Sequence, residues 1–302
     1  MSAALETNLA ELLGVDVDVV DRRRNDHTST SPSEILTCRL TDGRELRLLC
    51  KHASGPHHKA FGHRGGLQYE GLVYREVVNP SGLTAARCWG ELPNDEPVLV
   101  IDFVEHAVCV DEATPIEAAM RIAARWIGRF HRINEHSQRP LNRYDSSYYR
   151  LWVRRTAELA GDWHARLTWL RTLCSRAEEQ IGSLVDEQTT VIHGEYTPHN
   201  VLIRDGNAFP VDWESAAIAL GEIDLACLTD KWPAAIASLC EDAYAKARWP
   251  EGGGDDFQRR LDLARLYWDF RWLGDRPEWT TSERVGPRFE HLRTVSERLG
   301  LL

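Results

Sequence analysis

The sequence predicts an α+β fold with a small N-terminal lobe, built from an antiparallel sheet and one helix, followed by a larger and mainly helical lobe. Three observations indicate this fold. Two β-rich runs lie within residues 35–53, helical apolar spacing begins at Pro115, and a short β-rich segment at 190–213 interrupts the helical part. We place the boundary between residues 104 and 105, so that the lobes span 1–104 and 105–302.

The hairpin at residues 35–53 is the clearest element of the first lobe. Its two runs flank Asp42 and Gly43, a dipeptide that favours a tight turn between antiparallel strands. A small polar loop at 25–33 precedes the hairpin, and a segment rich in glycine and histidine, 55–66, follows it. The first lobe is therefore predicted to begin as strands joined by polar loops.

One helix and a second pair of strands complete the first lobe. The strands are predicted at 87–90 and 97–103. The helix is predicted from residues at helical spacing, namely Glu70, Val73, Tyr74, Val77 and Val78.

The second lobe begins with an amphipathic helix. Two further helical stretches are predicted near 146–160 and 163–185, the β-rich segment follows, and helices continue to the end of the chain. The residues that indicate the first helix recur every three or four positions: Ile116, Met120, Ala123, Ile127 and Phe130.

Composition and charge limit the classes of partner. The 302 residues carry a net charge of −10, whereas a protein that binds nucleic acid through its phosphates needs a positive charge. The seven cysteines form no Cys-x-x-Cys pair, which indicates reduced thiols. The N-terminus has no signal-peptide pattern, and no window is apolar enough to span a membrane. We expect a cytoplasmic monomer or homodimer with neither nucleic acid nor a membrane as partner.

Three polar residues stand near the ends of the short strands in the β-rich segment. They are Glu195, Asn200 and Asp212. An amide and a carboxylate are suitable oxygen ligands for Mg²⁺, which keeps its other positions for water and phosphate. A second carboxylate that does not bind the metal can accept the proton of an attacking hydroxyl. Taken singly, each residue is also explained as a cap or turn residue.

The spacing of these residues resembles the catalytic core of the aminoglycoside phosphotransferases. That superfamily includes choline-kinase-like and fructosamine-kinase-like enzymes and is related to protein kinases. Its usual form has aspartate where Glu195 stands, and its glycine lies farther from the aspartate of the third motif. The motifs here are His193-Gly194-Glu195-x-x-x-x-Asn200, then Val211-Asp212-Trp213-Glu214, then Gly221-Glu222-Ile223-Asp224-Leu225-Ala226.

The resemblance covers roughly residues 20–230 and implies a protein-kinase-like fold with a role for each motif residue. Glu195 would orient and deprotonate the acceptor hydroxyl, and Asn200 and Asp212 would hold Mg²⁺ on the phosphates. His193 would brace the catalytic loop by hydrogen bonding, and Asp224 would anchor that loop from a helix. Glu195 is one methylene longer than the family's aspartate, so a weakened or inactive enzyme remains an alternative.

In the first lobe, the resemblance implies a nucleotide site. Lys51 would neutralise the phosphates of ATP, or of GTP, and a glutamate on the next helix would hold it. Glu70 is the preferred partner, because its flank of the helix is the apolar one, and Glu76 is the rival. The other implied nucleotide contacts are Ser29, Thr30 and Ser31 in a loop over the phosphates and Asp102, Phe103 and Val104 in the connector beside the base.

Three residues near the C-terminus are candidates for the acceptor site. Trp268, Asp269 and Trp272 lie close to one face of a helix near the C-terminus, a pattern that usually marks core. The resemblance assigns the acceptor site to the helical lobe, so these residues and Glu195 are candidate substrate contacts. The net negative charge favours a cationic acceptor.

The sequence therefore predicts a small-molecule kinase that moves the γ-phosphate of ATP or GTP to a hydroxyl. Acceptors of this kind include aminoglycoside-like antibiotics, in which case the function is antibiotic resistance, and also amino sugars and amino alcohols. One alternative is a nucleotide-binding pseudokinase or regulator, suggested by Glu195 and a glycine-poor phosphate loop. A weaker alternative is a zinc metallohydrolase, suggested by several histidines: His52, His57, His58, His63, His193 and His199. The Pro-Cys-x-x-Cys element of zinc deaminases is missing from the sequence.

Overall fold

The computed structural model describes residues 3–26, 31–53, 65–93, 97–185, 188–252, 254, 256–275, 277–280, 282 and 285–302. These residues form two compact units. The first unit contains the described residues up to 113 together with 199–215. The second unit contains the described residues of 114–198 and those from 216 onward.

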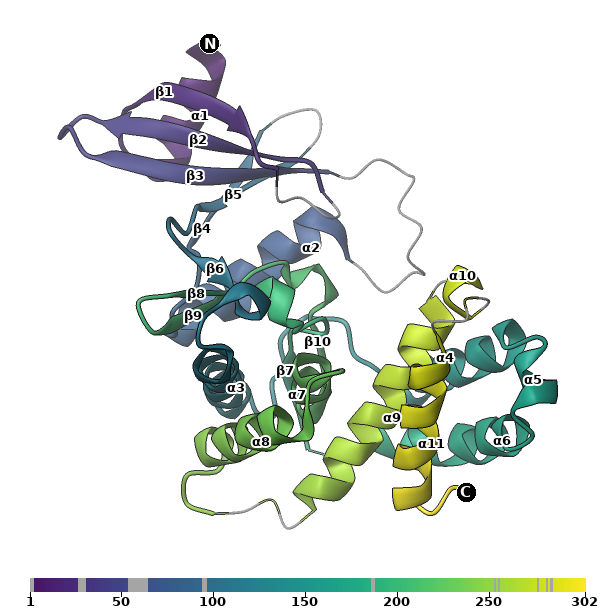
Figure 1. The fold of residues 1–302 in the computed structure, drawn as a ribbon. Coiled ribbons are helices and arrows are strands. Elements are labelled where there is room, and N and C mark those ends of the chain that lie inside the picture. The colour runs from purple at the N-terminus through teal and green to yellow at the C-terminus, as the bar shows by residue number, and fades with distance from the viewer. Residues whose placement is uncertain are drawn as a thin grey trace. The chain divides into compact units, whose positions relative to one another are not determined.

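A five-stranded antiparallel sheet forms the main part of the first unit (Figure 1). Its strand order is β1-β2-β3-β5-β4. The predicted hairpin is confirmed as β2 and β3, and Gly43 has a φ of 83° in the turn between them, a value that favours glycine. The strands are β1 (Val17–Arg24), β2 (Ser33–Leu40), β3 (Glu45–His52), β4 (Cys88–Leu92) and β5 (Val98–Asp102).

The sheet packs on an N-terminal helix, α1 (Ala3–Leu13), which the sequence patterns do not predict, just as they do not predict β1. Leu9 of α1 is fully buried and belongs to the same core cluster as Val17 and Val19 of β1. These two valines are the only buried residues of β1. A strand with so short an alternation gives a weak pattern, and the charged residues after Val19 hide it.

The predicted helix of the first unit is confirmed as α2 (Gly66–Val73), which continues into a wider π-helical turn, η1 (Tyr74–Val78), and a 3-10 turn, η2 (Asn79–Ser81). All five residues that predict the helix are buried. The helix therefore turns Glu70, as well as its apolar residues, toward the interior.

A small three-stranded sheet adds residues 199–215 to the first unit. Its order is β6-β8-β9, with β6 (Val108–Cys109), β8 (Val201–Arg204) and β9 (Asn207–Pro210). Short 3-10 turns flank these strands, namely η3 (Val110–Glu112), η5 (Pro198–Asn200) and η6 (Trp213–Ser215). Because β6 pairs with β8, contacts divide the chain differently from a single boundary at 104/105. The lobes 1–104 and 105–302 stay a prediction.

The second unit is mainly helical, as predicted. The stretch near 146–160 is confirmed as one helix, whereas 163–185 divides into two helices and a 3-10 turn. A two-stranded antiparallel sheet pairs β7 with β10. The elements are α3 (Ile116–Ile133), α4 (Ser146–Leu159), α5 (Trp163–Arg166), α6 (Leu170–Gln180), η4 (Ile181–Val185), β7 (Thr189–Ile192), β10 (Ala217–Leu220), α7 (Glu222–Thr229), α8 (Ala234–Arg248), α9 (Phe257–Asp275), α10 (Pro277–Thr280) and α11 (Gly286–Arg298).

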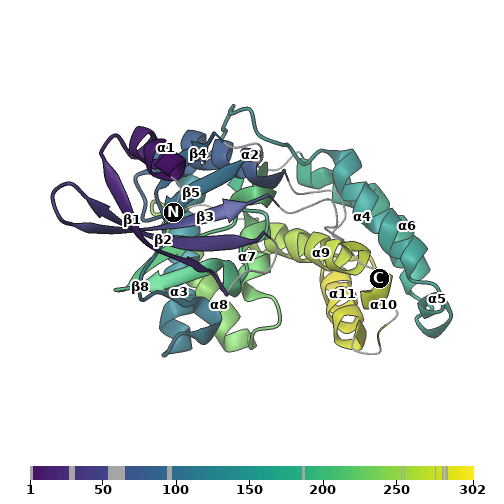
Figure 2. The same cartoon turned by 90° about the horizontal axis from the view of Figure 1, so that it is seen from above.

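Helices α3 and α8 lie side by side in both ribbon views (Figures 1 and 2). Their backbones approach closely at Gly128, where a Cβ atom would lie 2.7 Å from Tyr244 O. Met120, Ala123, Ile127 and Phe130 of α3 are fully buried, which confirms the predicted amphipathic face.

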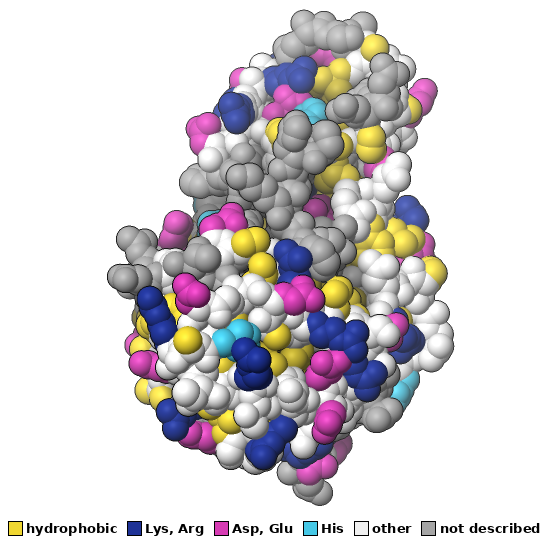
Figure 3. Space-filling view, turned by 90° about the vertical axis from the view of Figure 1, so that its right-hand side faces the viewer, with side chains coloured by type: hydrophobic (Ala, Val, Ile, Leu, Met, Phe, Trp, Pro, Cys, Tyr) yellow, Lys and Arg dark blue, Asp and Glu magenta, His cyan; other side chains and the backbone are white. Residues whose placement is uncertain are grey.

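The described helices include none that is long and apolar enough to cross a membrane. On the face drawn in Figure 3, the acidic and basic side chains that the structure describes are interspersed. The net charge is therefore not gathered into one patch among the described residues of this face.

Candidate active site

A largely buried lysine between two carboxylates forms the polar centre of the first unit. Lys51 Nζ on β3 lies 2.6 Å from Glu70 Oε2 on α2 and 3.0 Å from Asp212 Oδ1, which follows β9. Glu70 is fully buried, and its Oε1 accepts a hydrogen bond from the Trp213 amide over 3.3 Å. Strand, helix and loop thus converge on one ammonium group.

Charge balance keeps this ammonium group positive. Burial disfavours the charged form of Lys51, but the neighbouring Glu70 and Asp212 carboxylates outweigh burial and raise its pKa above the ordinary value. Lys51 therefore stays protonated at neutral pH and offers a fixed positive charge at the pocket described below.

The structure pairs Lys51 with Glu70 and not with Glu76. Glu76 instead contacts Arg75 over 3.1 Å, and both of those side chains are exposed to solvent by more than a third. The burial of Glu70 follows from its position beside Val73, Tyr74 and Val77, which occupy the inward face of the helix.

Asp212 and Asn200 supply the oxygen donors of a candidate metal site. Asp212 has a φ of 70°, an uncommon value for aspartate, in the turn that aims it at Lys51. Among the described residues, its second oxygen, Oδ2, has no hydrogen-bond partner. The Val211 amide donates to Asn200 O over 3.0 Å, which ties the two segments together. One carboxylate and one amide oxygen suit a hard cation such as Mg²⁺.

These residues line a pocket of about 330 Å³ that belongs wholly to the first unit. Its polar lining includes Lys51, Asn200 and Asp212, and Leu49, Ile101 and Leu202 give it apolar walls. Ser29 and Thr30 lie outside the described residues. The other predicted nucleotide contacts that line this pocket are Ser31, Asp102, Phe103 and Val104.

The connector residues differ in their free backbone groups. The Asp102 amide donates to Arg87 O and the Phe103 amide to Arg47 O, so both serve the protein itself. The Asp102 carboxylate also accepts a hydrogen bond from Trp89 Nε1 over 2.7 Å. Of the three predicted connector contacts, Val104 has no backbone acceptor for its amide among the described residues.

In the second unit, Asp224 on α7 holds the segment that follows β7. Its Oδ2 accepts from the His193 amide over 2.7 Å, and its Oδ1 accepts from the Gly194 amide over 2.9 Å. Asp224 is fully buried, and Gly194 has a φ of 83°. The predicted anchor residue therefore contacts the segment it was expected to hold.

A neutral histidine forms a hydrogen bond with Asp224. His131 Nε2 lies 3.0 Å from Asp224 Oδ2, and Tyr244 Oη lies 3.0 Å from His131 Nδ1. Burial lowers the pKa of His131 to about 4. The neutral imidazole donates its Nε2 proton to Asp224 and accepts at Nδ1 from Tyr244.

His193 and Arg271 fix the position of Glu195. The Glu195 amide donates to His193 Nδ1 over 3.3 Å. Arg271 on α9 donates from Nη2 to Glu195 Oε1 over 2.6 Å and from Nη1 to Gly194 O over 3.0 Å. Arg271 is buried, and although burial opposes its charge, Glu195 raises its pKa further above the ordinary value. One guanidinium therefore clamps both the carboxylate and its backbone.

Sequence reasoning missed Arg271, although it selected three neighbours on the same helix. The available signal was an arginine within a helix that is otherwise rich in apolar residues, and that signal alone does not identify a partner. Helix α9 buries residues on every side, so its sequence has no single inward face.

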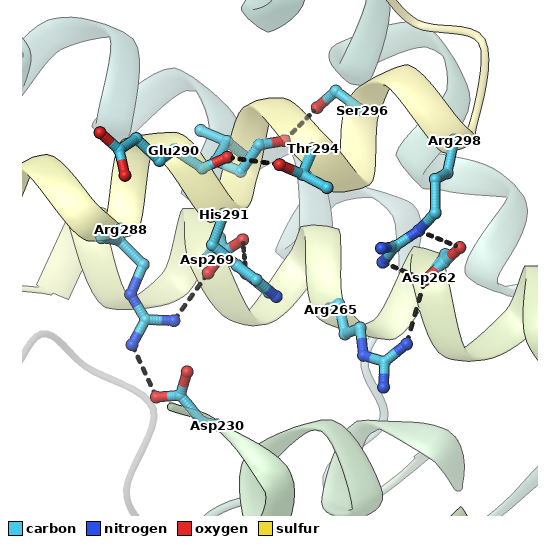
Figure 4. Close-up of polar contacts among 11 residues, drawn as sticks. Asp230, Asp262, Arg265, Asp269, Arg288, Glu290, His291, Thr294, Ser296 and Arg298 are labelled. Carbon is cyan, nitrogen blue, oxygen red and sulfur yellow. Dashed lines mark hydrogen bonds and ion pairs between the residues drawn. The ribbon is translucent and has the colours of Figure 1, made fainter. Parts of the chain in front are cut away.

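The predicted acceptor residues have structural contacts. Asp269 is fully buried and pairs with Arg288 Nη1 at 2.6 Å and His291 Nδ1 at 2.8 Å, which holds α11 on α9 (Figure 4). Trp268 lies under the Arg271 guanidinium, 4.9 Å from ring centre to carbon, and Trp272 lies likewise under that of Arg288. A contact of these residues with an acceptor stays a prediction.

Residues 73–272 match the phosphotransferase enzyme family, named APH. The chain belongs to this family. No curated protein matches it by sequence. Among solved structures, it resembles choline kinase from Cryptosporidium parvum Iowa II, with 14% identity, a TM-score of 0.62, and 95% of this chain and 91% of that one covered.

Two further structures share the fold of this phosphotransferase. Choline kinase LicA from Streptococcus pneumoniae has 13% identity and a TM-score of 0.60, with 99% and 98% of the two chains covered. An aminoglycoside phosphotransferase from Alicyclobacillus acidocaldarius has 13% identity and a TM-score of 0.60, with 95% and 90% covered. The predicted protein-kinase-like fold is thereby confirmed, and the protein is a small-molecule kinase.

Two alternatives lose their support. The described Lys51, Glu70, Asn200 and Asp212 are all in place, and nothing in the family match indicates a pseudokinase. The family match favours a phosphotransferase over a hydrolase. Of the described histidines that suggested a hydrolase, His52 pairs with Glu34, His193 is buried in the segment it braces, and His199 is exposed. The histidines at 57, 58 and 63 lie outside the described residues.

Proposed function

We propose that the protein is a Mg²⁺-dependent O-phosphotransferase that moves the γ-phosphate of ATP, or of GTP, to a hydroxyl of a small molecule. One observation carries the proposal, namely the Lys51 ammonium held between Glu70 and Asp212 in a pocket lined by the connector. A fixed cation beside hard oxygen donors is what phosphoryl transfer needs, because the reaction depends on positioning and charge neutralisation.

Each residue of the first unit takes one part of the nucleotide. Lys51 would bind the phosphates, and Glu70 would orient Lys51. Asn200 and Asp212 would hold Mg²⁺, which supplies charge neutralisation on the transferred phosphate. Val104 would donate its backbone amide to the base, because the Asp102 and Phe103 amides already have acceptors. Ser31, and Ser29 and Thr30 from the same loop, would cover the phosphates.

Glu195 would act on the acceptor. The acceptor oxygen forms a bond to the γ-phosphorus as the bond to the leaving nucleoside diphosphate breaks, and the hydroxyl proton passes to the Glu195 carboxylate. Arg271 orients that carboxylate, and His193 and Asp224 hold its backbone segment. A carboxylate of modest basicity suffices because the transition state is loose and the proton moves late.

We infer a cationic acceptor from the net charge of −10 and from the solved structures that this chain resembles. These include choline kinases, a complex of streptomycin and ATP with an aminoglycoside phosphotransferase, and an amicoumacin kinase. Amino alcohols, amino sugars and aminoglycoside-like antibiotics are the classes to test, and resistance to an antibiotic would follow from the last of these. All seven cysteines are free thiols, which supports a cytoplasmic location.

The test is release of nucleoside diphosphate, measured with ATP and with GTP, against a panel of amino alcohols, aminoglycosides, macrolides and neutral sugars. We expect one class to stimulate Mg²⁺-dependent release and to yield a phosphomonoester by mass spectrometry. The neutral sugars are the control for charge. Absence of Mg²⁺-nucleotide binding in a folded protein would overturn the proposal.

A further inference from the structure

Three side chains with metal-binding atoms gather at the edge of the pocket, apart from the Mg²⁺ donors proposed above. The thiol of Cys109, the carboxylate of Asp111 and the imidazole of His199 each offer one ligand atom, and these atoms lie within 4.8 Å of one another. Cys109 is half-buried, and the other two side chains are exposed, so an ion has access from solvent.

The strand register explains why these residues meet. β6 and β8 are antiparallel, with Val108 opposite Ile203 and Cys109 opposite Leu202. Continuing this pairing beyond the strands brings η3, which carries Asp111, alongside η5, which carries His199. His199 Nδ1 lies 3.9 Å from Asp111 Oδ2. All three residues belong to the first unit and are held by one short sheet.

The ligand types select a particular class of ion. Mg²⁺ requires oxygen ligands in an octahedron, and a thiol and an imidazole do not satisfy it. Zn²⁺ and Co²⁺ accept sulfur, nitrogen and oxygen in a tetrahedron, with three protein ligands and one position left for water. The three ligand atoms lie within 4.8 Å of one another, and the side chains would have to draw together to reach the bond lengths of about 2.0–2.3 Å that zinc requires.

We propose that Cys109, Asp111 and His199 bind a divalent transition-metal ion of the zinc class. Cys109 and His199 also line the pocket, and His199 directly precedes Asn200. An ion bound there occupies the pocket edge, and its positive charge repels the Mg²⁺ that Asn200 would hold with the nucleotide. Zinc binding therefore weakens nucleotide binding, a consequence that rests on the proposed function, whereas the metal site itself does not.

Cobalt is the probe for the site, because a thiolate ligand gives Co²⁺ an intense near-ultraviolet charge-transfer band. Titration of the nucleotide-free protein with Co²⁺ is expected to give this band at one equivalent, and Zn²⁺ is expected to remove it. Cys109→Ser should lose the band, and Asp111→Asn and His199→Ala should each weaken binding at least about tenfold. Thermal unfolding checks that each variant is folded.

His106→Ala is the matched control. His106 is an exposed histidine that lines the same pocket but is not part of the cluster, so its variant should bind Co²⁺ like the wild type. Binding to histidines of the 55–66 segment would produce no thiolate band. The proposal is overturned if the wild type shows no such band, or if the band persists in Cys109→Ser.

Competition with nucleotide completes the test. Binding of a fluorescent ATP analogue with Mg²⁺ should weaken when Zn²⁺ is added to the wild type and should be insensitive to Zn²⁺ in Cys109→Ser. A wild type that binds Co²⁺ through Cys109 but binds no nucleotide would contradict the proposed function alone. Equal sensitivity to Zn²⁺ in wild type and variant would contradict the coupling.

Discussion

Both units hold a functional side chain by ion pairing, but the charge of that side chain differs: it is the Lys51 ammonium in the first unit and the Glu195 carboxylate in the second. In the first, a largely buried cation lies between two carboxylates. In the second, the Glu195 carboxylate is held by the buried cation Arg271. The first group presents positive charge, suited to phosphates, and the second presents a carboxylate, suited to a hydroxyl proton. Each group depends on its partner, because removing one member of a buried pair leaves an uncompensated charge.

The largest effect is expected at Glu195. Glu195→Gln retains the shape of the side chain but cannot take a proton, so kcat should fall by roughly 10²- to 10⁴-fold while nucleotide binding stays unchanged. Product formation and binding of a fluorescent nucleotide measure the two properties. Glu179→Gln, which changes an exposed carboxylate of the same unit, is the matched control. Full activity in Glu195→Gln would remove this residue from the mechanism.

Lys51 is expected to follow. Lys51→Met removes the cation and leaves two carboxylates facing each other, so phosphate affinity and kcat/KM should fall by about 10²- to 10³-fold. The matched control is Lys246→Met, which removes an exposed lysine on α8. Unchanged nucleotide affinity in Lys51→Met would show that the phosphates bind elsewhere.

A change at Arg271 is expected to lower kcat alone. Arg271→Met frees the Glu195 carboxylate, and a misplacement of about 1 Å is expected to lower kcat about 100-fold. The KM for nucleotide should not change, since Arg271 does not line the pocket. Arg271→Lys retains the charge and should recover part of kcat. A general loss of folding in both variants, without this order, would make Arg271 structural only.

The last effect concerns stability in acid and not catalysis. His131 has a pKa of about 4 in the folded protein, below the 6.5 of an exposed histidine, so the unfolded chain takes up its proton first. The stabilising contribution of neutral His131 is complete above pH 6.5 and is lost as the pH falls to about 4. The loss amounts to about 3 kcal/mol, measured as unfolding free energy against denaturant. In His131→Asn this part of the pH dependence should disappear.

The fold was predictable where local patterns are strong. The hairpin around Gly43 and the buried face of α3 both follow from spacing and turn residues. The sequence did not predict that residues 199–215 pack with the first unit, because this depends on the pairing of β6 with β8 across about ninety residues of sequence. β1 was missed because only Val17 and Val19 are buried in it.

The sequence likewise predicted some residues of the candidate site and missed others. Asn200 and Asp212 followed from motifs whose order along the chain carries the information. Lys51 and Glu70 followed from the looser resemblance, a lysine at the end of a strand and a glutamate on the next helix. Arg271 contacts Glu195 from a helix that comes some seventy residues later, and its direction is set by the packing of α9. No local pattern contains that rotation, and for the same reason the sequence did not predict that Asp269 pairs with Arg288. Its contact with an acceptor stays a prediction.

Transfer of labelled γ-phosphate to an acceptor tests the central claim most directly. Wild type and Glu195→Gln would each be incubated with labelled ATP, Mg²⁺ and the acceptor class that stimulates nucleotide turnover. We predict a labelled phosphomonoester from the wild type, and almost none from the variant at equal nucleotide occupancy. Label released only as inorganic phosphate, or equal transfer by both proteins, would contradict the account.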